Sequence, residues 1–160
     1  MNTYIFTLLL FTIICSIADF YTNKNYARVW DKKTTQEKLY MILLLFIHYA
    51  IYFFIYVTLI FVILKHKTIK TKYLLLYLFI LIIIPLHWYT NNEKCYITEL
   101  QNKLLEIDEK CRFRDIFALL HDTYVCDETA TLKDNVYYYY IFFSMIYVIL
   151  IISIRLYRFI

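Results

Sequence analysis

Glycine is absent from this chain of 160 residues, and proline occurs once, at Pro85. At the average usage of about 7%, roughly eleven glycines would be expected. A phosphate-binding loop and a dinucleotide-binding turn both need glycine, because backbone N–H groups must approach the phosphate closely. We therefore expect no nucleotide as a ligand. Nucleic acid is likewise not among the expected partners. The small-residue motif of tightly packed transmembrane dimers is missing for the same reason.

Charged side chains are absent from three long runs of the chain and from a fourth run at its start. These runs cover residues 39–64, 73–92 and 135–154, with 26, 20 and 20 residues, and residues 1–18. About 20 apolar residues suffice for a helix to cross the roughly 30 Å hydrocarbon core. The chain is 62% hydrophobic with a mean hydropathy of +0.55, which is more apolar surface than a soluble domain of this size can bury.

The sequence therefore predicts an all-α integral membrane protein of four helices that forms one membrane domain. The expected spans are about residues 3–18, 39–64, 73–90 and 136–154. The first span is short, and the alternative is that it is a cleaved signal peptide. Ser16 and Ala18 are small residues at the third and first positions before a possible cleavage site that precedes Asp19. No Lys or Arg precedes it, which favours a retained helix.

The link between the second and third spans lacks acidic residues. Lys65 to Lys72 contains four lysines and no Asp or Glu. Four spans place this link on the same side as both termini, and Lys and Arg in short loops favour the cytosolic side. We expect the link and the termini to be cytosolic and residues 93–134 to be lumenal or external.

Residues 93–134 carry two apolar patterns of helical spacing, which predict an extramembrane helical hairpin between the third and fourth spans. The first pattern comprises Ile97, Leu100, Leu104, Ile107 and Cys111, and the second Phe113, Ile116, Phe117, Leu120 and Tyr124. Thr90 with Glu93 is expected to form a capping box where the first helix begins. The two helices are expected to be antiparallel and to close on one apolar seam.

Cys95 and Cys126 lie at the two ends of this hairpin, which an antiparallel pair brings together. A disulfide there would close a loop of about 30 residues and stabilise the hairpin by roughly 3–4 kcal/mol. It requires an oxidising compartment, in agreement with the expected topology. The alternative is that the three hairpin cysteines are reduced and partly buried.

Two histidines lie in or near the membrane, His48 inside the second span and His87 near the outer end of the third. An ionisable residue there is a functional hypothesis, and two histidines on neighbouring helices could bind haem. A neutral histidine that hydrogen-bonds a tyrosine or a carbonyl is the commoner situation, so no cofactor is expected and haem is the alternative. Zinc is not favoured, because no CxxC or CxH pair occurs. No catalytic residue emerges.

The segment from His87-Trp88 through Lys94-Cys95-Tyr96-Ile97-Thr98, together with Phe113-Arg114-Asp115, resembles small uncharacterised membrane proteins of large DNA viruses. The resemblance implies a four-helix membrane protein of unknown molecular function. We expect a non-enzymatic structural or interaction component of a membrane, a viral one under the resemblance, with lipid and other membrane or capsid proteins as partners. The alternative is a membrane redox or haem-binding protein that uses His48, His87 and the hairpin cysteines.

Overall fold

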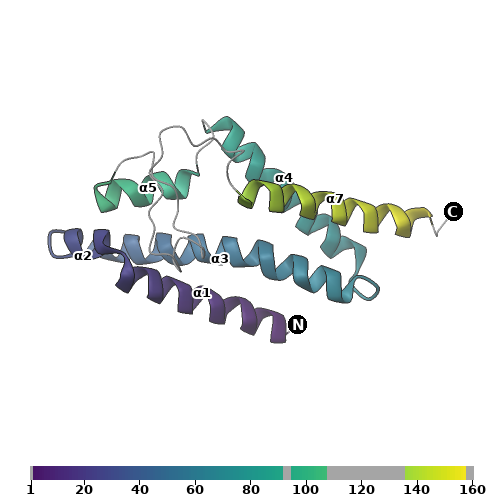
Figure 1. The fold of residues 1–160 in the computed structure, drawn as a ribbon, viewed down its shortest axis with the longest axis horizontal. Helices are drawn as coiled ribbons and strands as arrows, with labels where there is room; N and C mark the ends of the chain where they lie inside the picture. Colours follow the sequence, from purple (N-terminus) through teal and green to yellow (C-terminus); the bar gives the residue numbers. More distant parts are fainter. Residues whose placement is uncertain (1, 92–94, 108–135, 158–160) are drawn as a thin grey trace. The chain divides into compact units, whose positions relative to one another are not determined.

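The computed structural model describes residues 2–91, 95–107 and 136–157, and most of these residues lie in helices (Figure 1). The helices are α1 (Asn2–Thr22), α2 (Lys24–Trp30), α3 (Thr35–Lys65), α4 (Thr71–Thr90), α5 (Tyr96–Leu105) and α7 (Val136–Tyr157). No strand occurs within these ranges. The expectation of an all-α protein is confirmed for the part that the structure describes.

Among the described residues, four helices are long and apolar enough to cross a membrane. They are Thr3–Thr22 of α1, Thr35–Lys65 of α3, Thr71–Thr90 of α4 and Tyr138–Tyr157 of α7. Only 17% of the most apolar part of α1 is buried, against 39% in α3. Large side chains such as Phe6, Phe79 and Phe143 are exposed, which is compatible with a multi-pass membrane protein.

The chain divides into two compact units. The first unit contains α1, α2, the part of α3 up to Phe53, and α5. The second contains α3 from Phe54 onward, α4 and α7. Each unit has its own buried side chains and is described by itself.

In the first unit, α1 runs beside the first part of α3 (Figure 1), and the rings of Phe11 and Phe53 are 5.6 Å apart. The chain turns at Asn23, whose Oδ1 accepts a hydrogen bond from Asn25 N at 3.0 Å and caps α2. Residues 19–38 have the composition of a polar connector. The structure instead forms α2, which buries Tyr26 and Val29, three residues apart on one face.

A capping box occurs at the start of α3, not at the start of α5 where the sequence predicted one. Thr34 N donates to Glu37 Oε2 at 2.8 Å, and Glu37 N donates to Thr34 Oγ1 at 3.3 Å. The predicted box of Thr90 with Glu93 is wrong, because Thr90 is the last residue of α4 and its hydroxyl donates to Leu86 O. The N-cap of α5 is Cys95.

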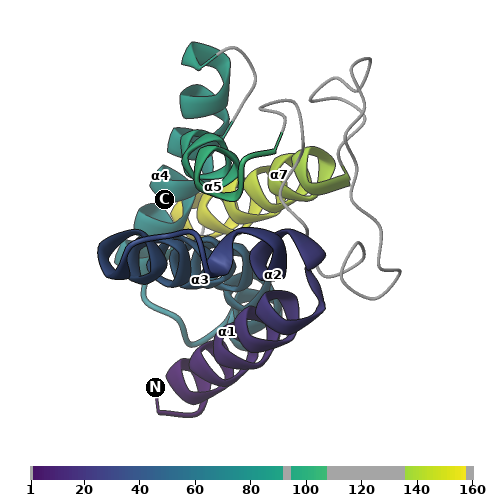
Figure 2. The ribbon, with the colours of Figure 1, turned by 90° about the vertical axis from the view of Figure 1, so that its left-hand side faces the viewer.

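In the second unit, α4 and α7 pack against each other (Figure 2). Both helices bury side chains at spacings of three and four, the pattern of a single helix face. These side chains are Leu74, Tyr77 and Leu81 on α4, and Ile141, Ser144 and Val148 on α7. The Tyr77 hydroxyl donates to Ile55 O of α3 at 2.8 Å, which links α4 to α3 through a buried hydrogen bond.

The first helix of the predicted hairpin exists as α5, but it buries a different face. Thr98, Gln101, Asn102 and Leu105 are buried, whereas the predicted seam residues Ile97, Leu100 and Leu104 are only half-buried. Ile107 lies beyond the helix end, because Glu106 adopts a left-handed conformation with φ 53°. The second predicted helix lies outside the described residues, so the hairpin stays a prediction.

Candidate functional site

Each helix of the first unit contributes a buried polar side chain to one region, which we call the polar cluster. It consists of Asp19 from α1, Tyr26 from α2, His48 from α3 and Gln101 from α5. Their exposed fractions are 1%, 1%, 9% and 4%. Buried polar groups normally have hydrogen-bond partners, because an unmet donor or acceptor costs free energy in an apolar environment.

Gln101 is the member that joins the cluster together. Its Nε2 donates a hydrogen bond to the Tyr26 hydroxyl at 2.8 Å. Gln101 and Asp19 are both close enough to His48 to interact with its ring electrostatically. Gln101 Oε1 is buried and has no hydrogen-bond partner among the described residues. The cluster therefore ties α5 to α2 and brings polar side chains of α1 and α3 alongside.

A second set of contacts holds the C-terminal end of α5. The Nη2 atom of Arg28 donates hydrogen bonds to Leu105 O at 2.8 Å and to Glu106 O at 2.9 Å. A helix C-terminus leaves carbonyl oxygens without intrahelical partners and carries a partial negative charge, which suits a guanidinium. Isolated helices of about ten residues are marginal in water, so α5 depends on these contacts to stay helical.

An ion pair lies beside this clamp, at the same helix end. Lys33 Nζ is 2.8 Å from Glu106 Oε1. The hydrogen bond and charge of Lys33 hold the pKa of the Glu106 carboxyl below its usual value. The Glu106 side chain is 51% exposed, so water screens this pair and its contribution to stability is small.

His48 and Cys95 are the predicted site residues that the structure brings together. Cys95 Sγ lies 4.0 Å from His48 Nε2, and Cys95 is half-buried and forms no disulfide with another described residue. His87 is exposed on α4 and belongs to the second unit. Cys126 lies outside the described residues, so its disulfide with Cys95 stays a prediction. Haem ligation by His48 and His87 likewise stays a hypothesis.

Metal binding has little support among the residues that the structure describes. These residues contain no group of three or more His, Cys, Asp or Glu side chains that could hold a metal ion. The pairing of His48 with Cys95 supplies only two ligands, whereas a zinc site uses three or four protein ligands. Cys111, His121 and Cys126, whose side chains could supply further zinc ligands, lie outside the described residues.

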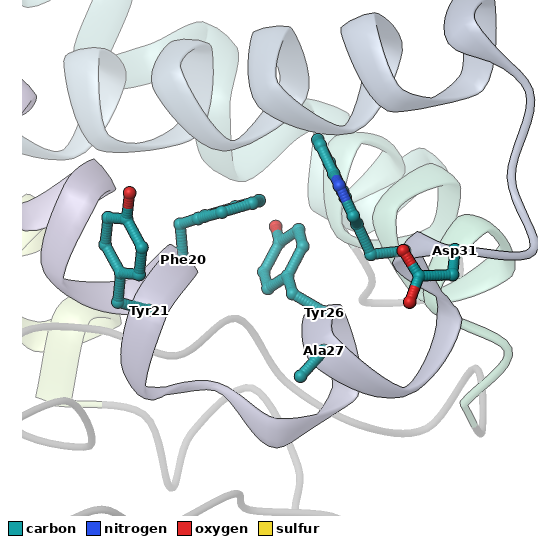
Figure 3. Close-up of a pocket in the computed structure, with 6 residues that line it drawn as sticks. Phe20, Tyr21, Tyr26, Ala27 and Asp31 are labelled. Atoms are coloured by element: carbon teal, nitrogen blue, oxygen red, sulfur yellow. The ribbon is translucent and has the colours of Figure 1, made fainter.

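A shallow aromatic pocket adjoins the polar cluster where α1 meets α2 (Figure 3). It is lined by Phe20, Tyr21, Tyr26, Ala27, Trp30 and Asp31. The Phe20 ring lies 5.2 Å from the Tyr26 ring and 5.0 Å from the Trp30 ring, as in packed aromatic clusters. Tyr26 thus presents its ring to the pocket and its hydroxyl to Gln101.

Sequence reasoning missed three members of the polar cluster. Gln101 did carry a signal, since Thr98, Gln101 and Leu105 share a helical spacing of three and four. The signal was hidden because the neighbouring apolar residues form a stronger stripe. Asp19 and Tyr26 carried none, because they stand in a stretch that reads as a connector.

The chain matches no protein-family model, no curated protein and no solved structure. Functional conclusions therefore rest on the apolar helices, the polar cluster and the charged turns described above.

Proposed function

We propose that the protein is a non-enzymatic, multi-pass membrane component that acts by contact with neighbouring molecules in the bilayer. One observation supports this most strongly. In the first unit, polar side chains join one helix to another, as Gln101 of α5 bonds Tyr26 of α2 and Arg28 of α2 bonds the C-terminal end of α5. Apolar side chains meanwhile cover the outside of the long helices. This distribution suits a scaffold better than a catalyst.

The topology of this scaffold follows from the lysine-rich link. With the link and both termini in the cytosol, α5 and residues 93–134 are lumenal or external. The half-buried face of α5, formed by Ile97, Leu100 and Leu104, supports the hairpin, because it is an apolar surface that a second amphipathic helix could cover. In this proposal the segment with Phe113, Ile116, Phe117 and Leu120 is that helix, and a Cys95–Cys126 disulfide fastens its base.

The partners in this proposal are the lipid bilayer and other proteins of the same membrane. Under the resemblance to viral membrane proteins, capsid proteins join this group. The exposed aromatic and aliphatic residues of α1 and α7, such as Phe6, Ile14 and Phe143, would contact them within the bilayer. A contact role needs no cavity and no reactive group.

Photo-crosslinking in the native membrane tests the contact role. A photoreactive amino acid replaces Ile14, which is 52% exposed, and in a matched control replaces Leu105, which is 0% exposed. We expect the Ile14 variant to give discrete protein adducts, and the Leu105 variant to give none with other proteins. Adducts with lipid alone, at Ile14 and again at Phe143, would contradict a role in protein contact.

The second candidate function is a membrane redox or haem-binding protein, and the 4.0 Å approach of Cys95 Sγ to His48 Nε2 favours it. An imidazole beside a thiol can accept its proton and increase its reactivity. An absorption spectrum of the detergent-purified protein separates the two candidates. A Soret band that disappears in both His48→Gln and His87→Gln would support haem binding, and a spectrum without one favours the contact role.

A further inference from the structure

The turn between α3 and α4, residues 65–72, is densely cationic, and we call it the lysine turn. Lys65, Lys67, Lys70 and Lys72 are all exposed. The turn joins two helices that are each long enough to cross the hydrocarbon core, Thr35–Lys65 and Thr71–Thr90. This inference rests on the proposed membrane arrangement, in which a turn between two such helices lies at the depth of the lipid headgroups.

Arg155 of α7 holds this turn in one conformation. Its Nη1 donates to Ile69 O at 2.7 Å and to Thr71 Oγ1 at 3.2 Å, and its Nη2 donates to His66 O. Within the turn, Lys65 O accepts hydrogen bonds from Thr68 N and Ile69 N, at 2.9 and 3.0 Å. The lysine side chains therefore extend from a backbone that is fixed at several points.

The start of α4 lacks the capping side chain and the acidic residues that usually stabilise a helix N-terminus. Its N-cap is Lys70, which makes no side-chain capping hydrogen bond, and its first turn contains no acidic residue. Lys72 adds a second cation there, and its Nζ lies 5.3 Å from the centre of the Tyr73 ring. A helix N-terminus carries a partial positive charge, so cations destabilise it and anions stabilise it. Local conflicts of this kind are expected at functional sites.

The described helices that flank the lysine turn carry no acidic side chain that would relieve this conflict. Residues 38–92 and 135–160 contain no Asp or Glu, so α4, α7 and the second half of α3 are free of acidic side chains. The positive-inside preference alone would accept lysines anywhere in the link. It does not explain why two of them, Lys70 and Lys72, stand at a helix N-terminus that lacks a side-chain cap, on a turn held by an arginine.

We propose that the lysine turn binds the phosphate of an anionic phospholipid headgroup. Lys67, Lys70 and Lys72 supply the positive charge, and the N-terminal end of α4 adds its partial positive charge in the same direction. Arg155 is a positioning residue, which acts through the backbone of the turn. The headgroup depth of the turn favours a lipid over a soluble acidic protein as the source of the phosphate.

The test compares two double variants of the full chain in detergent. Lys67→Gln with Lys70→Gln removes two cations of the turn. Lys24→Gln with Lys32→Gln removes two cations of the first unit that are also exposed. Affinity for short-chain phosphatidylglycerol is measured by native mass spectrometry. At roughly fivefold per lysine near a charged surface, the turn variant should bind about 25-fold more weakly, and the control variant as the wild type does.

Further arms identify the ligand and the role of Arg155. Phosphatidylcholine, which carries the same phosphate but no net charge, should bind more weakly than phosphatidylglycerol, and raised salt should weaken phosphatidylglycerol binding. Arg155→Gln should lower the affinity and speed amide exchange in residues 66–71 together. Equal binding by the wild type and the turn variant would overturn the proposal. So would an equal loss in the control variant, or full displacement of the lipid by inorganic phosphate at the same concentration.

Discussion

Replacing Tyr26 by Phe tests whether the polar cluster ties α5 to the rest of the first unit. The substitution removes one oxygen atom and keeps the aromatic ring that packs against Phe20. It leaves Gln101 Nε2, on a side chain that is 4% exposed, without the hydrogen bond of 2.8 Å that it makes in the wild type. Tyr21→Phe is the matched control, because Tyr21 is 80% exposed.

The expected cost follows from the burial of both partners. A buried donor that loses its acceptor costs about 1–3 kcal/mol. Because α5 is too short to be stable alone, this cost falls on the docking of α5, and local opening should become about 5- to 150-fold more frequent. The spans should be little affected, since lipid holds them independently of this helix.

Hydrogen exchange followed by mass spectrometry, on the protein in lipid nanodiscs, measures this opening directly. We expect faster exchange in Tyr26→Phe at the amides of residues 96–105, and wild-type exchange in Tyr21→Phe. Unchanged exchange of α5 in Tyr26→Phe would refute the argument that the Gln101–Tyr26 hydrogen bond holds this helix. A uniform increase across all helices would instead show that the substitution acts on the whole fold.

Two further predictions concern α5. Leu105→Ala should destabilise the docking of α5 by about 2–5 kcal/mol, because the side chain is fully buried, whereas Leu104→Ala, at a half-buried position, should cost less. Hydrogen exchange of the α5 amides measures both effects. A larger effect of Leu104→Ala would favour the apolar seam that the sequence predicted. The pKa of Glu106 is lower in the folded protein than in the unfolded chain. Its ion pair with Lys33 therefore stabilises α5 fully at pH values above the ordinary carboxyl pKa, and this stabilisation is lost as the pH falls through the pKa of Glu106 in the folded protein. The ratio of α5 exchange rates between Glu106→Gln and the wild type should therefore fall towards one below a pH of about 4, and a ratio independent of pH would contradict this.

The long helices were predictable because their signal depends only on length and the absence of charge. A run such as residues 39–64 has no other stable conformation in a bilayer, where each backbone polar group must bond within its own helix. The observed helices extend beyond the apolar runs, as α3 does to Thr35, since polar residues in a first turn also adopt helical geometry.

The buried face of α5 was not predictable from periodicity, for a physical reason. Periodicity identifies the apolar stripe, and that stripe is buried only when nothing else competes for the interior. Here Gln101 has a buried partner in Tyr26, and Arg28 fixes the helix end, so the polar face lies inward. Such pairings join residues that are more than seventy positions apart, and no local pattern records them.

The candidate site was only partly predictable. His48 stood out as an ionisable residue in a span, and Cys95 stood out at a predicted helix start, but their contact depends on how α5 docks. Asp19 reads as the polar residue that ends the first apolar run, and only the packing of the first unit shows that it is 1% exposed. Burial of polar groups is a tertiary property, so composition and spacing do not reveal it.

Cysteine accessibility in intact cells tests the central claim, a four-span protein whose lysine turn is cytosolic, most directly. Two single-cysteine proteins are compared, one that retains only Cys95 and one that carries only Thr68→Cys. Both positions lie outside the charge-free cores of the spans and are at least partly exposed. An impermeant maleimide should label Cys95 from outside and should label Thr68→Cys only after the membrane is permeabilised. Labelling of Thr68→Cys in intact cells, with Cys95 protected, would contradict the topology on which the account depends.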